Sequence, residues 1–258
     1  MTTAFPFTSA LVTGASSGIG EAMAELLGEA GIPTVVVARR TDRLQELADR
    51  FEHFEVLAAD LTTPSGVATV VARVADSALP IDLVVNNAGF GTSGDFISLD
   101  PDRLADEVRL NIEALTRLSH AALAAMVPRG RGYLLNVSSV ASFQPAPKLA
   151  VYAATKAYVT NLTESLHEEV RGTGVHVTAL CPGLTRTEFQ SVSNSDSYAS
   201  QYPTFAWLEA REVAEAALRD VAKGKALSVP GAIYKGMVSG SSILPRRLAR
   251  RLSGLVQR

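Results

Sequence analysis

Short runs of apolar, mainly β-branched residues recur along this chain and alternate with longer segments of helical periodicity. Within each run the apolar residues are consecutive instead of alternating with polar ones, which indicates strands buried on both faces of a parallel sheet. The pattern predicts strands at 10–13, 34–38, 54–58, 83–86, 133–137, 175–180 and 226–229.

Helical periodicity fills the intervals between these strands. Gly31 with Pro33 ends the first predicted helix, and Gly172 with Gly174 ends the fifth. The strand–helix alternation, with right-handed crossovers, predicts an α/β fold: a doubly wound (Rossmann) parallel sheet of about seven strands with helices on both faces. The predicted helices are 20–30, 43–50, 66–77, 104–126, 152–171 and 211–223.

Two segments depart from this regularity. Residues 184–206 are polar and serine-rich with interleaved aromatic residues, which is typical of a substrate lid or of a disordered loop. Residues 237–258 form a C-terminal extension, in which leucines at helical spacing and arginines predict a basic amphipathic helix at 243–258. We favour packing of this helix on the body or on a partner subunit over weak peripheral contact with an anionic membrane.

Composition narrows the class of protein. With 258 residues, 47% apolar and 19% charged, the chain (1–258) fits one large globular domain. A net charge of −2 argues against a nucleic-acid partner. Cys181 is the one cysteine, so an internal disulfide is excluded and a cytoplasmic location is expected. We expect no secretory signal, no transmembrane segment and no metal site.

A glycine-rich loop connects the first strand to the first helix. Residues 13–20 read TGASSGIG, and such glycines let the backbone turn sharply and approach a ligand. The free N–H groups at the helix N-terminus then suit a pyrophosphate, although a tight turn without a ligand is the alternative. The predicted cofactor contacts in this loop are Gly14, Ser16, Ser17, Gly18, Ile19 and Gly20.

Arg39 and Arg40 follow the second strand, where a site selective for NAD usually carries an acidic residue. Arginine makes charge-assisted contacts with a ribose 2′-phosphate, so we predict NADP(H), with NAD(H) as the less favoured cofactor. Alternatively, both arginines are solvated or pair with Asp42 or Glu46.

Tyr152 and Lys156 lie one helical turn apart and so face the same way. An adjacent ammonium is expected to lower the pKa of the phenol, making the pair a proton donor and acceptor for a carbonyl/alcohol couple. Alone, this spacing also fits an ordinary exposed helix. Ser139 precedes Tyr152 by thirteen residues, which favours it over Ser138 as the third member.

Together these motifs resemble the short-chain dehydrogenase/reductase family, from Ala10 to about Gly231. The resemblance implies a catalytic tetrad in which Tyr152 protonates the carbonyl oxygen and Ser139 hydrogen-bonds it. Lys156 would bind the nicotinamide ribose, and Asn111 would hold a water linking Lys156 to solvent. The cofactor contacts that the resemblance implies are Asp60, Leu61, Asn87, Ala88, Gly89, Tyr152, Lys156, Pro182, Gly183 and Thr187.

The predicted function is hydride transfer between NADP(H) and a carbonyl or secondary alcohol of a medium-sized hydrophobic substrate: a ketone, an aldehyde or a 3-oxoacyl compound. Two alternatives are a catalytically silent NADP-binding sensor or scaffold and an epimerase or dehydratase of the same family. The resemblance also implies a homodimer or homotetramer. An apolar, aromatic substrate pocket is expected from Phe90, Phe96, Phe143, Gln144, Leu149, Phe189, Tyr198, Tyr202, Phe205 and Trp207.

Overall fold

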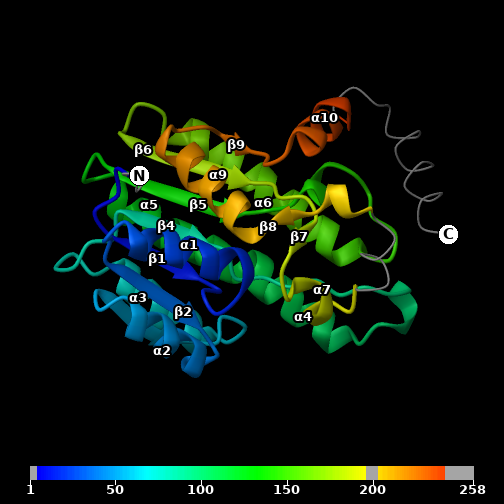
Figure 1. Ribbon diagram of the computed structural model, residues 1–258, viewed down its shortest axis with the longest axis horizontal. Helices are drawn as coiled ribbons and strands as arrows, with labels where there is room; N and C mark the ends of the chain where they lie inside the picture. Colours follow the sequence, from blue (N-terminus) through cyan, green and yellow to red (C-terminus); the bar gives the residue numbers. More distant parts are fainter. Residues whose placement is uncertain (1–4, 196–202, 242–258) are drawn as a thin grey trace.

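A seven-stranded parallel sheet forms the centre of the computed structural model, which describes residues 5–195 and 203–241 (Figure 1). The strand order is β3-β2-β1-β4-β5-β6-β9, and every pairing in the sheet is parallel. This confirms the predicted fold class. The strands are β1 (Ala10–Thr13), β2 (Thr34–Ala38), β3 (Phe54–Ala58), β4 (Leu83–Asn86), β5 (Gly132–Val137), β6 (Val175–Leu180) and β9 (Leu227–Ser228).

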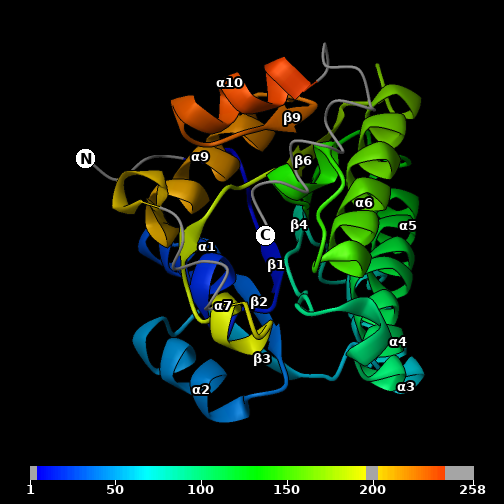
Figure 2. The same cartoon turned by 90° about the vertical axis from the view of Figure 1, so that its right-hand side faces the viewer.

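Helices cover both faces of the sheet, as Figure 2 shows from the side. One face carries α1 (Gly18–Glu29), α2 (Thr41–Arg50) and α9 (Ala210–Ala222). The opposite face carries α3 (Pro64–Val74), α5 (Leu115–Met126) and α6 (Ala150–Glu169). None of the helices among the described residues has the length and apolar character needed to cross a bilayer.

Successive strand residues supply two separate hydrophobic cores. In β1, Ala10 and Val12 belong to the core under α1 and α9, whereas Leu11 belongs to the core under α3 and α5. All three are fully buried, which explains why the strands read as continuous apolar runs. Shortening Leu11 to alanine would cost about 2–5 kcal/mol of stability.

The helix predicted over 104–126 starts earlier and is irregular. α4 (Pro101–Val108) begins after Asp100, whose carboxylate accepts a hydrogen bond from the Asp102 amide at 3.0 Å. A π-helical segment, Arg109–Ala114, then joins α4 to α5. Such segments are frequent at functional sites, and this one carries Asn111.

The loop predicted at 184–206 contains short elements where the structure describes it. β7 (Thr185–Arg186) pairs with β8 (Leu208–Glu209), and α7 (Phe189–Val192) follows β7. An additional helix, α10 (Ala232–Ser241), follows β9 and was not predicted as such. The basic helix predicted at 243–258 lies outside the described residues.

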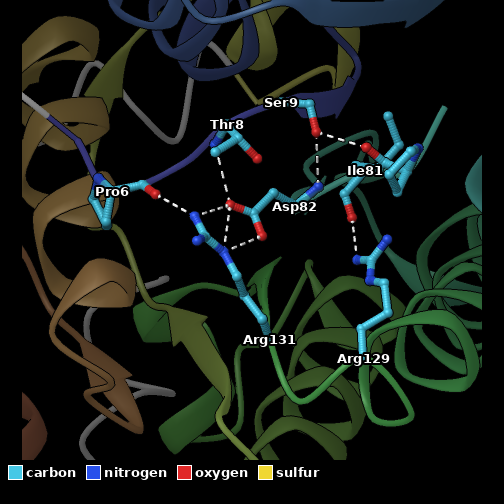
Figure 3. A network of polar contacts seen from close by, with 8 residues as sticks. Pro6, Thr8, Ser9, Ile81, Asp82, Arg129 and Arg131 are labelled. Atoms are coloured by element: carbon cyan, nitrogen blue, oxygen red, sulfur yellow. Dashed lines mark hydrogen bonds and ion pairs between the residues drawn. The ribbon is translucent and has the colours of Figure 1, made fainter.

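A polar network around Asp82 fixes the amino-terminal ends of three central strands (Figure 3). The buried Asp82 carboxylate accepts hydrogen bonds from the Arg131 guanidinium at 2.9 Å and from the Thr8 amide at 3.1 Å. Arg131 also donates to the Pro6 carbonyl at 2.8 Å, so the starts of β1, β4 and β5 are tied together. Ligands of open parallel sheets usually bind at the opposite end, beside the carboxyl ends of the strands.

Candidate active site

A cavity of about 710 Å³ opens at the carboxyl ends of the strands. Loops that follow β1, β2, β3, β4, β5 and β6 line it, together with residues of α6, α7 and α10. The cavity brings together the predicted cofactor and catalytic residues, except Gly20 and Asn111, which do not line it but contact the lining residues Asn87 and Phe90.

The glycine loop shapes one end of this cavity. Gly14 and Gly18 have φ angles of +67° and +62°, a conformation that favours glycine. A Cβ on Gly14 would lie 2.8 Å from the Asn87 amide nitrogen, and one on Gly18 would lie 2.9 Å from the Thr187 methyl group. Gly20 lets the Gly14 carbonyl approach the start of α1. The backbone of residues 14–20, here called the cradle, therefore suits a diphosphate at the N-terminus of α1.

Asn87 and Thr13 join the ends of β4 and β1 beside that cradle. The Thr13 hydroxyl accepts from the amides of Asn87 at 2.9 Å and Ala88 at 3.0 Å, and the Asn87 side chain donates to the Thr13 carbonyl at 2.9 Å. These bonds place Ala88 and Gly89 along the cavity wall.

Asp60, at the end of β3, presents its carboxylate to Thr62. It accepts from the Thr62 amide at 2.9 Å and from the Thr62 hydroxyl at 2.7 Å. Burial raises the pKa of Asp60, but these bonds and the charge of Arg39 outweigh it and hold the pKa below its usual value. An ionised, oriented carboxylate beside Leu61 is consistent with a contact to a nucleoside.

Arg39 and Arg40 both line the cavity and are exposed. The Arg40 guanidinium forms an ion pair with Glu188 at 2.9 Å and donates to the Ser16 carbonyl at 3.0 Å. Pairing of Arg40 with Asp42 or Glu46 is therefore not observed; Glu46 instead faces Arg43 at 3.5 Å. Arg40 thus links the glycine loop to the segment that precedes α7.

The catalytic candidates lie on α6 and on the loop after β5. The Lys156 Nζ lies 5.7 Å from the centroid of the Tyr152 ring and donates to the Val137 carbonyl at 2.8 Å. Ser139 acts on the Tyr152 hydroxyl through a hydrogen bond that lowers its pKa. Ser138 instead donates to the Lys156 carbonyl at 2.8 Å. Ser139 therefore stays the predicted third member of the set.

The expectation that Lys156 lowers the pKa of Tyr152 is wrong for this structure. Burial raises the pKa of Tyr152 to about 12, and the charge of Glu107 adds to the rise. Burial also lowers the pKa of Lys156 to about 8. The reason is that the ammonium is directed at the Val137 carbonyl and is itself desolvated, so desolvation dominates both groups.

Asn111 stands behind the cavity wall and holds the loop after β4. Its side-chain nitrogen donates to the Phe90 carbonyl at 2.8 Å and to the Thr155 hydroxyl at 3.1 Å. A Cβ on Gly89 would lie 2.9 Å from the Asn111 oxygen and 3.4 Å from the Lys156 Nζ. Asn111 and Lys156 are therefore neighbours across Gly89.

Three contributors to this region were not predicted from the sequence. Glu107 is fully buried one helical turn before Asn111, a spacing that could have drawn attention to it. Glu188 pairs with Arg40, and Tyr234 of α10 packs against Gly183 and bonds to the Leu184 amide at 3.0 Å. The latter two pairings join residues far apart in sequence and leave no local signal.

The substrate part of the cavity is only partly as expected. Phe90, Gln144, Leu149 and Phe189 line it, and the Phe189 ring lies 5.4 Å from that of Tyr152. Tyr198 and Tyr202 lie outside the described residues. The predicted aromatic residues that do not line the cavity are Phe96, Phe143, Phe205 and Trp207.

Residues 8–197 match the family model described as short chain dehydrogenase. An uncharacterized oxidoreductase of Staphylococcus epidermidis is 37% identical over 179 residues, covering 69% of this chain and 78% of the relative. The chain therefore belongs to the short-chain dehydrogenase family and is an oxidoreductase.

Solved structures of the same family agree over most of the chain. A short-chain dehydrogenase from Sphingobium yanoikuyae, in complex with NADPH, superposes with a TM-score of 0.81 at 33% identity, covering 92% of this chain and 96% of that one. A bulky-bulky ketone specific alcohol dehydrogenase from Comamonas testosteroni gives a TM-score of 0.77 at 30% identity, covering 93% and 95%.

Proposed function

We propose that this protein is an NADP(H)-dependent oxidoreductase that interconverts a hydrophobic carbonyl compound and the corresponding secondary alcohol. The observation that carries this proposal is one continuous cavity with a glycine cradle and two arginines at one end and Tyr152 with Ser139 at the other. The NADPH complex of the Sphingobium relative and the ketone specificity of the Comamonas relative support the same assignment.

The residues that line the cavity fit the successive parts of NADP(H). Backbone N–H groups of residues 16–19 at the start of α1 would hold the diphosphate. Arg39 and Arg40 would contact the 2′-phosphate, and Asp60 with Leu61 would contact the adenosine. When bound, the nicotinamide supplies or accepts the hydride. The residues that would surround it are Asn87, Ala88, Gly89, Tyr152, Lys156, Pro182, Gly183 and Thr187.

Tyr152 is suited to donate a proton to the carbonyl oxygen during reduction. Burial raises the pKa of Tyr152 to about 12, so its hydroxyl is protonated at neutral pH and can act as the donor. The Ser139 hydroxyl lies beside it and would stabilise the negative charge that develops on the same oxygen. In the oxidative direction Tyr152 would take the proton back.

Lys156 supplies a positive charge next to this pair. Its pKa, lowered to about 8 by burial, leaves most molecules protonated at neutral pH while allowing the ammonium to release a proton. Asn111 holds the adjacent backbone in place through Phe90 and Thr155. We propose Asn111, Ser139, Tyr152 and Lys156 as the catalytic set.

An apolar wall of the cavity indicates the substrate class. Apolar side chains from the loop after β5, from α7, from α10 and from the segment before β8 line it, and the Phe189 ring lies 5.4 Å from that of Tyr152. A medium-sized hydrophobic ketone, aldehyde or 3-oxoacyl compound fits this wall. Its members are Leu149, Phe189, Val192, Ala206, Ile233 and Met237.

The test is turnover of a panel of hydrophobic ketones and aldehydes, followed by the loss of NADPH or NADH absorbance. We expect consumption of NADPH with at least part of the panel, and slower consumption of NADH. Binding of NADPH without turnover of any carbonyl or matching alcohol would leave a silent NADP-binding protein and overturn the proposal.

A further inference from the structure

An ion pair joins two segments that leave the sheet far apart. Arg40 follows β2, whereas Glu188 follows β7 and so comes from the chain beyond β6. In the sheet β1, β4 and β5 stand between β2 and β6, which are therefore about 19 Å apart. The Arg40 Nη1 nevertheless lies 2.9 Å from the Glu188 carboxylate. The chain after β6 must run back across the carboxyl ends of the central strands to make this contact (Figure 2).

The segment that crosses, residues 185–188, is here called the strap, and it packs on the glycine loop. A Cβ on Gly18 would lie 2.9 Å from the Thr187 methyl group. Arg40 is bonded to the same loop, because its Nε donates to the Ser16 hydroxyl at 3.2 Å and its Nη2 to the Ser16 carbonyl at 3.0 Å. Arg40 thus holds the glycine loop and the strap together, and all of these residues line the cavity.

The neighbouring arginine is held differently. Arg39 also lines the cavity, but it forms no hydrogen bond or ion pair with any of the described residues. Its guanidinium is therefore available for a phosphate, whereas all three nitrogens of the Arg40 guanidinium already have partners. The two adjacent arginines consequently differ in what they can do, and Arg40 has a role besides contact with the 2′-phosphate.

We propose that the ion pair between Arg40 and Glu188 is a latch that closes the strap over a bound pyridine nucleotide and slows its release. Glu188 is thus a positioning residue that acts through Arg40. The inference rests on the cofactor part of the proposed function and deepens it. A diphosphate in the cradle would lie beside Gly18, where Thr187 of the strap also lies. Its release would require the strap to separate from the glycine loop, which breaks the ion pair.

The latch also connects the cofactor part of the cavity to the substrate part. Glu188 is followed directly by Phe189, whose ring lies 5.4 Å from that of Tyr152. The far end of α7 is attached to the loop after β4, since the Ser193 hydroxyl accepts from the Gly91 amide at 3.0 Å. The latch therefore holds the end of α7 that carries Phe189, and breaking it should also raise KM for the carbonyl substrate.

The exposure of the pair sets the size of the expected effect. The side chains of Arg40 and Glu188 are 43% and 49% exposed, and ion pairs this open to solvent contribute little and are screened by salt. We therefore expect the latch to slow release about two- to fivefold. A weak latch suits an enzyme that must exchange its cofactor in every catalytic cycle.

The first experiment measures release of NADPH and of NADH by stopped-flow fluorescence, with excess NADP⁺ as the displacing nucleotide. Glu188→Gln should release both nucleotides about two- to fivefold faster than the wild type. Glu209→Gln is the matched control and should leave both rates unchanged. Glu209 is an exposed acid of β8 that pairs with Arg186 at 2.9 Å but does not line the cavity.

Two results of this experiment would overturn the proposal. One is release of both nucleotides from Glu188→Gln at the wild-type rates. The other is slower release of NADPH with unchanged release of NADH, because Glu188 would then compete with the 2′-phosphate for Arg40 instead of closing the strap.

A double-mutant cycle tests whether Glu188 acts through Arg40. Release of NADH is the measurement, since this nucleotide has no 2′-phosphate that Arg40 could contact. We expect Arg40→Gln with Glu188→Gln to release NADH at the rate of Arg40→Gln alone, because the latch is already lost in the single variant. Multiplication of the two single effects in the double variant would contradict the latch.

A third measurement needs neither cofactor nor turnover. Hydrogen exchange of the cofactor-free protein should be faster at the amides of residues 189–192 in Glu188→Gln than in the wild type, and unchanged there in Glu209→Gln. Equal exchange in Glu188→Gln and the wild type would overturn the latch. A protein that shows the expected exchange and release rates but reduces no carbonyl keeps the latch and loses the proposed reaction, so the two failures are distinguishable.

Discussion

The two ends of the cavity are built in different ways. The cradle end consists of backbone turns, half-buried glycines without side chains and two exposed arginines. The catalytic end consists of side chains from distant elements whose pKa values are displaced by burial, namely Tyr152, Lys156 and Glu107. The comparison indicates that cofactor affinity depends on local backbone shape, whereas the proposed chemistry depends on charges enclosed by the whole fold.

The largest effect is expected at the catalytic end. Tyr152→Phe removes the proposed proton donor and should lower kcat/KM by about 10²–10⁴-fold, the usual contribution of general acid–base catalysis. NADPH affinity, measured by fluorescence titration, should change little. Tyr158→Phe is the matched control, because this tyrosine also lies on α6 but bonds to the Thr116 hydroxyl at 3.0 Å. Equal turnover by Tyr152→Phe and the wild type would remove Tyr152 from the mechanism.

The pH dependence of the free energy of unfolding should also reveal the burial of Glu107. In the folded protein burial raises the pKa of Glu107 from 4.5 to about 7, so the folded state binds more protons than the unfolded state between these pH values. The free energy of unfolding should therefore fall as pH rises through this window, by about 3 kcal/mol from this group. Urea denaturation at pH 4.5 and 8 measures the fall. Glu107→Gln should abolish this contribution, and Asp106→Asn, at a half-exposed acid paired with Arg109, should retain it; identical pH dependence in both variants would contradict it.

At the cradle end, Gly18→Ala should weaken NADPH binding by about 2 kcal/mol, roughly thirtyfold, through loss of a charge-assisted backbone contact. The added Cβ would press on Thr187 at 2.9 Å. Gly31→Ala is the matched control, since its φ of +71° imposes similar backbone strain but nothing lies within 4 Å of the added atom. Similar NADPH dissociation constants for the two variants would show that the cradle does not hold the cofactor.

The smallest effect is expected at the exposed arginines. Arg39→Ala should raise KM for NADPH about tenfold, as loss of one exposed charge-assisted contact would, and leave KM for NADH nearly unchanged. Arg43→Ala, an exposed arginine paired with Glu46 on α2, serves as the control. If Arg39→Ala alters both KM values equally, the preference for NADP(H) has another origin.

The elements of the fold were predictable because their signals are local. The consecutive apolar residues of β1 and β2 mark strands buried on both faces, and the structure places these strands at the predicted residues. The glycine loop was predictable for the same reason, because glycines at this spacing indicate a sharp turn, and Gly14 and Gly18 have the positive φ angles that such a turn requires. The π-helical segment at Arg109–Ala114 was not, because its residues carry an ordinary helical pattern.

The electrostatics of the catalytic end could not be predicted from spacing. The sequence places Tyr152 and Lys156 on one helix face, but the direction of each pKa shift depends on how completely α6 and its neighbours exclude water. In the sequence, nothing distinguishes Glu107 from a solvent-exposed acid such as its neighbour Asp106. Only the packing of α4 against α6, with Arg103 held by Val192, buries it.

The proposal that Tyr152 supports hydride transfer from NADPH to a carbonyl carbon can be tested with NADPH deuterated at both C4 positions of the nicotinamide. The ketone that the protein consumes fastest is reduced, and the product is analysed by mass spectrometry. We expect an alcohol with one deuterium on the carbinol carbon, formed at similar rates by the wild type and by Tyr158→Phe and at least about a hundredfold more slowly by Tyr152→Phe. Product without deuterium, or labelled product formed equally well by Tyr152→Phe, would contradict it.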